Sequence, residues 1–522
     1  MRPKLTEIED YATVIREFAP ARLWELFDGD REQMNLAHEC LDRHRAKGTA
    51  VSVKFEDGRL EHYGFAELAD LTSQFAHWLV RRGVPAGARV AVILEPGRAF
   101  YTCLFGAIKR GAIAVPMFTL FGPDGLALRI NDCTPTLVLT TDHAAALRAQ
   151  FPQLQVITID AAFWTELAGE ATVFEPTTAA NDLAVFQYTS GTTRALPEAV
   201  KHTQRAVVTV MIAALYGVGL RPGDRYFCPS SPAWGHGLWH GTISPLALGI
   251  HTATYAGRFA AERVFEALET LAIDNFAAAA TVYRMLRNAD LRARYQIKLK
   301  KCTFTGEPLD ADTFDWIEQA FGVAPGSMYG TTEVGVIVVD FPGLRGHQIK
   351  RGALGRAAPG NEVTILDAAG NPAPVDTIGE IAVKRQGQWF RVKDFGRCDK
   401  DGYFYHAGRA DDVIISAGWT MSAVEIENTL LSHPAVAEAA VVGVPDPLRG
   451  QIAQAFLVAR TGHHVDPQEI QTYLKARLSK HEYPRLVTVV AELPKTPAGK
   501  INRKALRDQA PTSHFNDTLG NS

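Results

Sequence analysis

The first 330 residues alternate between helical and strand-like apolar patterns, and this alternation limits the fold more than any other feature of the chain. A helical pattern that ends at Gly83 carries its apolar residues on one face: Phe65, Leu68, Ala69, Phe75 and Leu79. The runs at 89–94 and 112–117 are short, apolar and strand-like, and a helical pattern at 98–111 separates them. This β-α-β order predicts an α/β fold of layered parallel sheets flanked by helices.

The length of the chain requires more than one domain, because 522 residues exceed what one ordinary core supports. After about residue 340, short strands separated by Gly, Pro, Asn and Asp predict a small β-barrel-like unit, as in 362–374 and 379–390. We then expect a small α+β domain with helices at 423–433 and 466–481 and strands at 437–444, 451–460 and 486–493. The predicted domains are residues 1–410 and 411–522.

Charge and cysteine content exclude several classes of function. Lys and Arg number 54 and Asp and Glu 57, so no basic field exists to hold a nucleic acid. The most apolar stretch, 206–220, is too short to cross a membrane. The six cysteines form no CxxC pair, and the start MRPKLTEIED lacks the apolar core of a signal peptide, so we expect a cytoplasmic, reducing setting.

One loop carries an unusual set of hydroxyl groups. The segment YTSGTTRALPEAVKH (188–202) follows the apolar run 183–186 and places four hydroxyl-bearing residues and a glycine together: Thr189, Ser190, Gly191, Thr192 and Thr193. Glycine lets a backbone approach a phosphate closely, and hydroxyls donate to its oxygens. The loop lacks the GxxxxGK[ST] pattern of P-loop proteins. Phosphate binding and an ordinary surface turn are both open on this segment alone.

Further motifs follow this loop in the order known from one superfamily. They are YTSGTT (188–193), GEP (306–308), YGTTE (329–333), Asp394 ahead of GRADD (408–412), and PKTPAGK (494–500). In these motifs the chain resembles the adenylate-forming superfamily, and it looks closest to the medium-chain and aromatic acyl-CoA synthetases. The resemblance covers nearly the whole chain.

The resemblance implies an ATP-dependent acid:CoA ligase that forms AMP and pyrophosphate through an acyl-adenylate. Its substrates are a small-molecule carboxylic acid, ATP and coenzyme A, with Mg²⁺ as cofactor. Residues 1–410 would then bind ATP and the acid, and a mobile C-terminal domain would bring a catalytic lysine. Because two anions must meet, catalysis would rest on positioning and charge stabilisation.

Motif positions suggest catalytic roles for three residues. Lys500 would bridge the carboxylate and the α-phosphate, Thr332 would contact the α-phosphate, and Glu333 would hold Mg²⁺. Acetylation of Lys500 by a lysine acetyltransferase would remove its charge and silence the enzyme. A solvated tail lysine and a helix-start glutamate are the alternative interpretations.

The resemblance also implies the remaining binding residues. Asp394 would accept the ribose hydroxyls with Arg409 nearby, Asp411 would be the hinge, and Gly418 with Trp419 would line the pantetheine tunnel. The other nucleotide-binding residues are Thr189, Ser190, Gly191, Thr192, Thr193, Gly306, Glu307, Pro308, Tyr329, Gly330 and Thr331. For Tyr329, a place in the core is an equal alternative to stacking on adenine.

This chain departs from the family pattern at three places. The phosphate loop continues as 193–200 with Arg194 and Glu198 where relatives carry glycine and lysine, and Arg194 or Lys201 is a candidate for the lost positive charge. Val-Lys-Asp replaces Thr-Gly-Asp at 392–394. Trp419 and Thr420 stand where relatives carry a tyrosine and an arginine.

An acyl pocket is expected along 231–241 and beside Tyr329. Its predicted wall is apolar: Trp234, His236, Gly330, Val334, Gly335, Val336 and Ala280. Acetate-specific relatives carry tryptophan at the position of Gly330, so a glycine there predicts a hydrophobic monocarboxylate larger than acetate, aliphatic or aromatic. His236 and His240 are alternatively ordinary core or surface histidines.

Two other functions remain open on the sequence. An adenylating enzyme that loads a carrier protein would carry the same motifs, although no carrier domain is fused here. A catalytically silent nucleotide-binding protein would explain the altered phosphate loop, whereas Glu333, Asp394, Arg409 and Lys500 favour an active enzyme.

Overall fold

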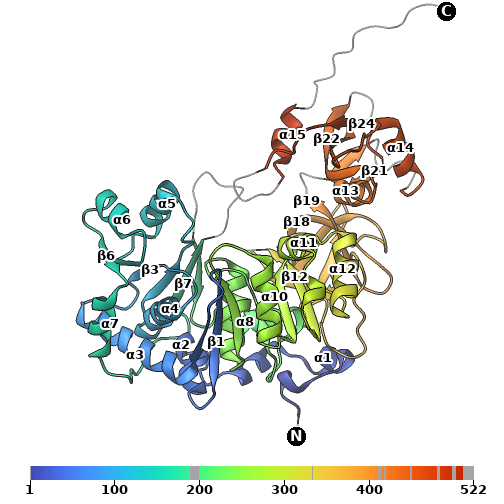
Figure 1. Ribbon diagram of the computed structural model, residues 1–522. Helices are drawn as coiled ribbons and strands as arrows, with labels where there is room; N and C mark the ends of the chain where they lie inside the picture. Colours follow the sequence, from blue (N-terminus) through green and yellow to red (C-terminus); the bar gives the residue numbers. More distant parts are fainter. Residues whose placement is uncertain are drawn as a thin grey trace, which may run out of the picture.

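The computed structural model describes residues 2–188, 199–331, 333–409, 413–416, 419–446, 450–478, 483–495 and 501–509. Figure 1 shows a broad body, coloured blue to yellow, that holds two large sheets side by side, and a smaller orange-to-red part that follows β19. The predicted α/β fold with a small C-terminal domain is confirmed.

The first large sheet has six strands in the order β6-β5-β3-β4-β7-β8, all parallel except for β8 at the edge. Its strands are β3 (Arg89–Ile93), β4 (Ile113–Pro116), β5 (Leu137–Thr140), β6 (Gln155–Thr158), β7 (Leu183–Tyr188) and β8 (Ala199–Thr203). The helices of this part are α3 (Phe65–Arg81), α4 (Arg98–Arg110), α5 (Pro123–Cys133), α6 (Ala144–Gln150) and α7 (Ala161–Ala168). The β-α-β order predicted for 89–117 is confirmed.

The second large sheet has nine strands in the order β15-β14-β13-β12-β11-β9-β10-β1-β2. They are β1 (Thr49–Phe55), β2 (Leu60–Gly64), β9 (Tyr226–Phe227), β10 (Thr252–Ala256), β11 (Asn275–Ala279), β12 (Lys301–Thr305), β13 (Gly326–Thr331), β14 (Gly335–Val339) and β15 (Arg356–Ala357). The helices are α1 (Tyr11–Glu17), α2 (Leu36–Cys40), α8 (Ala206–Ile212), α9 (Ser244–Ala247), α10 (Ala261–Thr270), α11 (Ala280–Ala289) and α12 (Ala311–Phe321). Its middle strands from β1 to β13 are parallel, so their carboxyl ends lie along one edge.

Two smaller units complete the chain: the first is an antiparallel sheet, and the second is a mixed sheet in which β24 runs parallel to β23. The β-rich unit expected after residue 340 has four strands, β16 (Val363–Leu366), β17 (Gly379–Arg385), β18 (Gln388–Cys398) and β19 (Phe404–Arg409). The last unit contains β20 (Val413–Ser416), β21 (Trp419–Ser422), β22 (Val436–Asp446), β23 (Gly450–Ala459), β24 (Leu486–Val489), α13 (Ala423–Leu431), α14 (Pro467–Lys475) and α15 (Arg503–Gln509). The chain passes from the first of these sheets to the second between β19 and β20.

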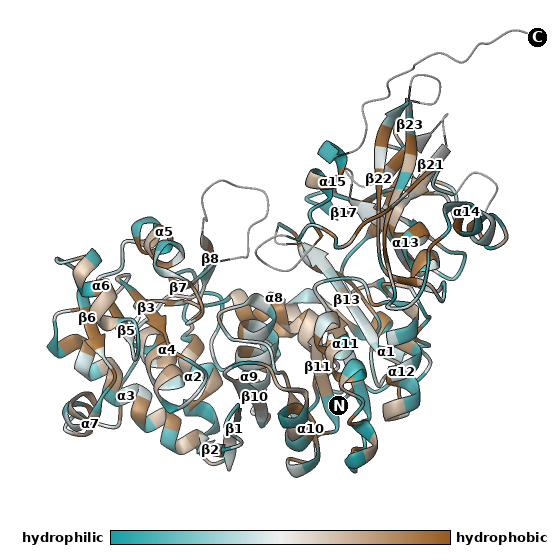
Figure 2. Cartoon of the chain, turned by 45° about the horizontal axis from the view of Figure 1, so that its top comes forward, coloured by the Kyte–Doolittle hydropathy of each residue, from teal (hydrophilic) through white to brown (hydrophobic). Residues whose placement is uncertain are grey.

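Local signals explain the helix limits. All five apolar residues predicted on one face of α3 are buried, and the helix ends before Gly83, whose φ of 71° suits a residue without a Cβ. At α14 the Asp466 side chain accepts from the amide of Gln468, and Pro467 takes the first helical position. Figure 2 shows brown, hydrophobic strands enclosed by helices whose outer faces are teal.

The apolar stretch 206–220 lies in the core. It forms α8 and a π-helical turn at 213–217 whose residues are all buried. Among the residues that the structure describes, no helix is long and apolar enough to cross a membrane.

Candidate functional site

The site is assembled where three parallel strands end. Strands β11, β12 and β13 are neighbours, so the segments that follow them meet at one edge of the sheet. Ala280 follows β11, Gly306 follows β12, and Gly330 lies near the end of β13. Sheet topology therefore brings together the GEP and YGTTE motifs, which lie more than twenty residues apart in the sequence.

The GEP segment is fixed by contacts within the protein. The Glu307 carboxylate accepts from the amide of Thr281 at 3.2 Å, at the start of α11, and pairs with Arg284 at 2.7 Å. Gly306 has a φ of 92°, and a Cβ on it would lie 3.2 Å from the Trp234 ring. Glu307 thus anchors the turn, and Trp234 packs directly on its glycine.

Tyr329 and Asp394 join two motifs from different sheets. The Tyr329 hydroxyl donates to Asp394 Oδ2 at 2.8 Å, and the Asp394 side chain is buried. This bond orients the carboxylate that the sequence assigns to the ribose. Tyr329 is also partly buried against the core of the β-rich unit, in line with the core alternative, and stacking on adenine stays a prediction.

His406 was not identified from the sequence. Its Nε2 lies 3.8 Å from Asp394 Oδ2, and within the described residues its buried Nδ1 has no hydrogen-bond partner. Strand pairing explains the contact, because His406 lies opposite Gly396 and therefore shares a sheet face with Asp394 two residues earlier. The alternating residues of β18 and β19 are typical of strands, but the sequence does not show which residues of the two strands lie opposite each other.

Lys393 has the backbone of a glycine. Its φ is 64°, in the left-handed region, and its amide donates to Glu380 Oε1 at 3.2 Å. The family's Thr-Gly-Asp pattern has glycine at this position, and here lysine adopts a left-handed backbone conformation beside Asp394. The Val-Lys-Asp departure therefore keeps the acid and lies where the pairing of β17 with β18 is shifted by a bulge.

Glu333 fits a magnesium ion bound mainly through phosphate oxygens. Its side chain is exposed just after the end of β13. Across the described ranges, no group of three or more His, Cys, Asp or Glu side chains is arranged to hold a metal. Mg²⁺ commonly binds through one or two carboxylates and substrate phosphates, so a single glutamate is a suitable donor set.

Gly330 has a structural reason to be glycine. A Cβ on it would lie 2.0 Å from the Gly335 carbonyl oxygen and 2.6 Å from Val336 Cα. Its missing side chain thus faces the backbone of β14, where Gly335 has a φ of 69°. The close approach of the two strands requires glycine here, so this residue alone does not measure the size of an acyl pocket.

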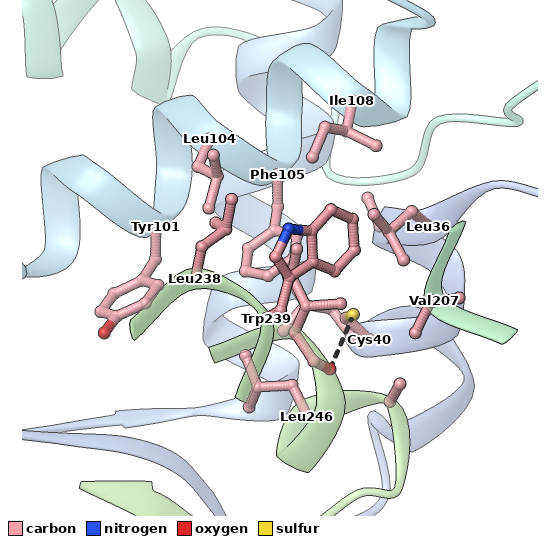
Figure 3. Packing of buried hydrophobic residues seen from close by; sticks show 14 of the residues in the cluster. Leu36, Cys40, Tyr101, Leu104, Phe105, Ile108, Val207, Leu238, Trp239 and Leu246 are labelled. Carbon is pink, nitrogen blue, oxygen red and sulfur yellow. Dashed lines mark hydrogen bonds between the residues drawn. The ribbon is translucent and has the colours of Figure 1, made fainter. Parts of the chain in front are cut away.

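The expected acyl wall is a π-helical segment at 236–243, a rare conformation that often marks functional sites. Figure 3 shows Leu238 and Trp239 of this segment packed against Tyr101, Leu104 and Phe105 of α4. The Trp239 indole donates to Gln187 Oε1 at 3.1 Å. These contacts hold the segment rigidly against the large core.

Three rings form a row from the GEP turn into this segment. Ring centroids of Trp234 and His236 are 5.8 Å apart, and those of His236 and His240 are 5.7 Å apart. Burial, with a smaller effect of His240, lowers the pKa of His236 to about 3, and burial lowers the pKa of His240 to about 4. Both imidazoles are therefore neutral at physiological pH.

Several predicted site residues lie outside the described residues: Thr189, Ser190, Gly191, Thr192, Thr193, Arg194, Glu198, Thr332, Asp411, Gly418 and Lys500. For Arg409 in β19 and Trp419 in β21 the structure describes the backbone only. Lys201 lies in β8 with its Nζ 5.5 Å from the Phe186 ring centroid. The roles expected for these residues stay predictions.

Comparisons with known proteins agree with this geometry. Residues 42–390 match the family described as AMP-binding enzyme, and residues 425–500 match the AMP-binding enzyme C-terminal domain. The acetyl-coenzyme A synthetase of Bacillus subtilis (strain 168) is 30% identical over 91% of this chain and 90% of its own length. The mitochondrial acyl-coenzyme A synthetase ACSM3 of Rattus norvegicus is 28% identical over 91% of this chain and 90% of its length.

A solved structure is also similar. The anthranilate CoA ligase AuaEII in complex with anthranoyl-AMP superposes with a TM-score of 0.80 at 25% identity, covering 94% of this chain and 99% of that one.

Proposed function

The chain belongs to the AMP-binding enzyme family, as an AMP-forming acid:CoA ligase that uses ATP, Mg²⁺ and coenzyme A, and we propose that its acid is a hydrophobic monocarboxylate larger than acetate. The observation that carries this proposal is the Trp234 ring packed on Gly306, which sets an apolar wall directly beside the nucleotide motif. The described wall residues include no lysine or arginine that could pair with a second carboxylate of a dicarboxylic acid.

The reaction needs two displacements. A carboxylate oxygen of the acid attacks the α-phosphorus of ATP, and the bond to pyrophosphate breaks. The CoA sulfur then attacks the acyl carbon, and AMP leaves. Most of the catalytic effect comes from holding reactants in line and neutralising charge. In this scheme Tyr329 orients Asp394, Asp394 accepts the ribose hydroxyls, and Glu333 would hold Mg²⁺, which neutralises phosphate charge when bound.

The C-terminal part supplies the rest of the proposal. We place the domain boundary at 410/411, supported by the change of sheet between β19 and β20. Asp411 would be the hinge, Gly418 and Trp419 would contact pantetheine, and Lys500 would stabilise the charge that develops during adenylation. Acetylation of Lys500 by a lysine acetyltransferase would remove that charge. The six free cysteines suit the proposed cytoplasmic location.

The test is AMP release by the full-length protein with ATP and Mg²⁺, with and without CoA. The panel holds acetate, straight-chain acids up to decanoate, benzoate and phenylacetate. We expect AMP release that requires both an acid and CoA, with kcat/KM for a longer or aromatic acid at least about 10-fold above that for acetate. Preference for acetate, the substrate in the name of the Bacillus subtilis relative, would overturn the substrate proposal alone.

The same panel separates the other functions. AMP release with an acyl carrier protein but not with CoA would indicate a carrier-loading enzyme. ATP binding without AMP release for any acid would indicate a silent homologue and would point to the loop 193–200.

A further inference from the structure

We propose that the acid carries a hydroxyl group, which the His236–His240 pair binds at the far end of the acyl pocket. This inference rests on the proposed function and narrows its substrate class to hydroxylated monocarboxylates. It is carried by the position of the two rings and by their unpaired nitrogen atoms.

The pair lies where the distal part of an acid would reach. Trp234 packs on Gly306 of the nucleotide motif, His236 follows at 5.8 Å and His240 at a further 5.7 Å between ring centroids. The ring of His236 lies within hydrogen-bonding reach of the Ala277 carbonyl of β11, close to the edge where the site forms, and this contact opposes the lowering of its pKa by burial. An acid whose carboxylate is at the nucleotide therefore extends past Trp234 towards His236.

The nitrogen atoms of this pair lack partners in a way that is unusual for buried polar groups. Apart from the Ala277 carbonyl near His236, no partner among the described residues satisfies the ring nitrogens of His236 or Nδ1 of His240, although His236 is only 6% exposed. Two other histidines have a partner: the buried His44 contacts the Ala247 carbonyl at 3.1 Å and the partly buried His251 contacts Ser52 Oγ at 2.7 Å. Like His240, the rings of His202, His347 and His406 each have one buried nitrogen without a partner among the described residues. Because an unpaired buried polar atom destabilises the fold, such atoms call for a functional explanation.

The chemistry of the pair selects the group it can bind. A neutral imidazole offers one N–H donor and one acceptor nitrogen, and a hydroxyl is both a donor and an acceptor. Burial disfavours the imidazolium form, so a second carboxylate would find no charge partner here. A hydroxyl group satisfies both rings without a charge, whereas a plain alkyl or phenyl end leaves them unpaired.

The experiment compares matched acids that differ by one hydroxyl: butyrate with 4-hydroxybutyrate, hexanoate with 6-hydroxyhexanoate, and benzoate with 3- and 4-hydroxybenzoate. The measured quantity is kcat/KM for CoA-dependent AMP release by the full-length protein. For at least one pair we expect the hydroxylated acid to be favoured by about 10-fold or more, since a site built to bind a hydroxyl rejects analogues that lack it. Equal or better use of the plain acid in every pair would overturn the inference and leave the ligase function standing.

His236→Leu is the informative variant, because leucine fills the space without hydrogen bonding. We expect the hydroxyl preference to fall to about 1, because kcat/KM for the hydroxylated acid should fall more than kcat/KM for the plain acid. An equal loss for both members of a pair would show that the ring only packs, and would overturn the inference. His251→Leu removes a buried but paired histidine and should keep the preference. Should His236→Leu fail to fold, His236→Asn, which keeps a donor and an acceptor, should keep part of the preference, and the wild-type comparison still decides.

Discussion

The nucleotide side and the acid side of the proposed site differ in the polar groups that line them. On the nucleotide side, Glu307 is held by Thr281 and Arg284, and the Asp394 carboxylate by the Tyr329 hydroxyl. On the acid side they are the neutral imidazoles of His236 and His240, and among the described residues His240 Nδ1 has no hydrogen-bond partner. The nucleotide is common to the whole family, so its geometry can be set in advance by the protein. The acid differs between relatives, and we propose that its side of the site is completed by the substrate.

The largest effect is expected from a residue that belongs to neither side. In Lys500→Ala we expect adenylation to fall roughly 10³-fold, because the positive charge between the two reacting anions is lost. Thioester formation from supplied acyl-adenylate should stay near wild type. Single-turnover assays of the two half-reactions measure this directly.

Lys495→Ala is the matched control, since Lys495 lies in the same motif but pairs with Glu438 at 2.9 Å on the surface. It should leave both half-reactions unchanged. Equal losses of both half-reactions in Lys500→Ala would contradict the proposed role of Lys500 in adenylation.

The comparison is sharpened by Asp394→Asn. The amide keeps the shape but presents only one acceptor oxygen, so we expect kcat/KM for ATP to fall about 10- to 100-fold. The ratio of rates between different acids should not change, because the acid side is untouched. Steady-state kinetics with varied ATP at two saturating acids measure both quantities. Asp376→Asn, which removes a surface pair with Arg397, is the control. A shift in acid preference would break the separation between the two sides.

Buried neutral histidines on the acid side also predict how stability depends on pH. The pKa of His236 falls from an ordinary 6.5 to about 3 on folding, so the unfolded chain binds the proton more tightly. Above pH 6.5 the buried histidines are neutral in both states and do not lower the stability of the fold. As the pH falls below 6.5, the unfolded chain takes up protons first and the free energy of unfolding decreases. At pH 5 each such histidine reduces the free energy of unfolding by about 2 kcal/mol.

Urea denaturation at pH 7 and pH 5 tests this expectation. The difference in unfolding free energy between the two pH values should be smaller by about 2 kcal/mol in His236→Leu than in wild type. His463→Leu, which changes an exposed histidine, is the control variant. An unchanged difference in His236→Leu would mean that this ring is protonated in the folded protein, and the acid side would then carry charge.

The sequence predicted features that depend on neighbouring residues better than features that depend on contacts between distant strands. The helix α14 was predicted because its cap, Asp466 and Pro467, is local in the sequence. The motif order predicted that Tyr329 and Asp394 share a site, and the structure supplied the hydrogen bond. His406 was missed because its contact with Asp394 depends on the register of β18 with β19, which a bulge shifts. Gly330 was interpreted as open space, although a partner strand approaches it there.

The smallest expected effect concerns strain on the nucleotide side. Lys393 has a φ of 64°, which costs a residue with a Cβ about 1–2 kcal/mol. Glycine removes that cost but raises the entropy of the unfolded chain by about 0.5–1 kcal/mol, so Lys393→Gly should stabilise the fold by about 0.5–1 kcal/mol. Lys393→Ala keeps the strain and should give no gain, which separates the backbone effect from loss of the lysine charge. Chemical denaturation measures the stability, and kcat/KM for ATP is followed in parallel.

If side-chain contacts alone fix the geometry of the nucleotide side, activity stays unchanged in Lys393→Gly while stability rises. A more stable variant with weaker ATP use would instead show that the strained backbone itself aims Asp394, and that the order of this side is maintained at a cost to the fold.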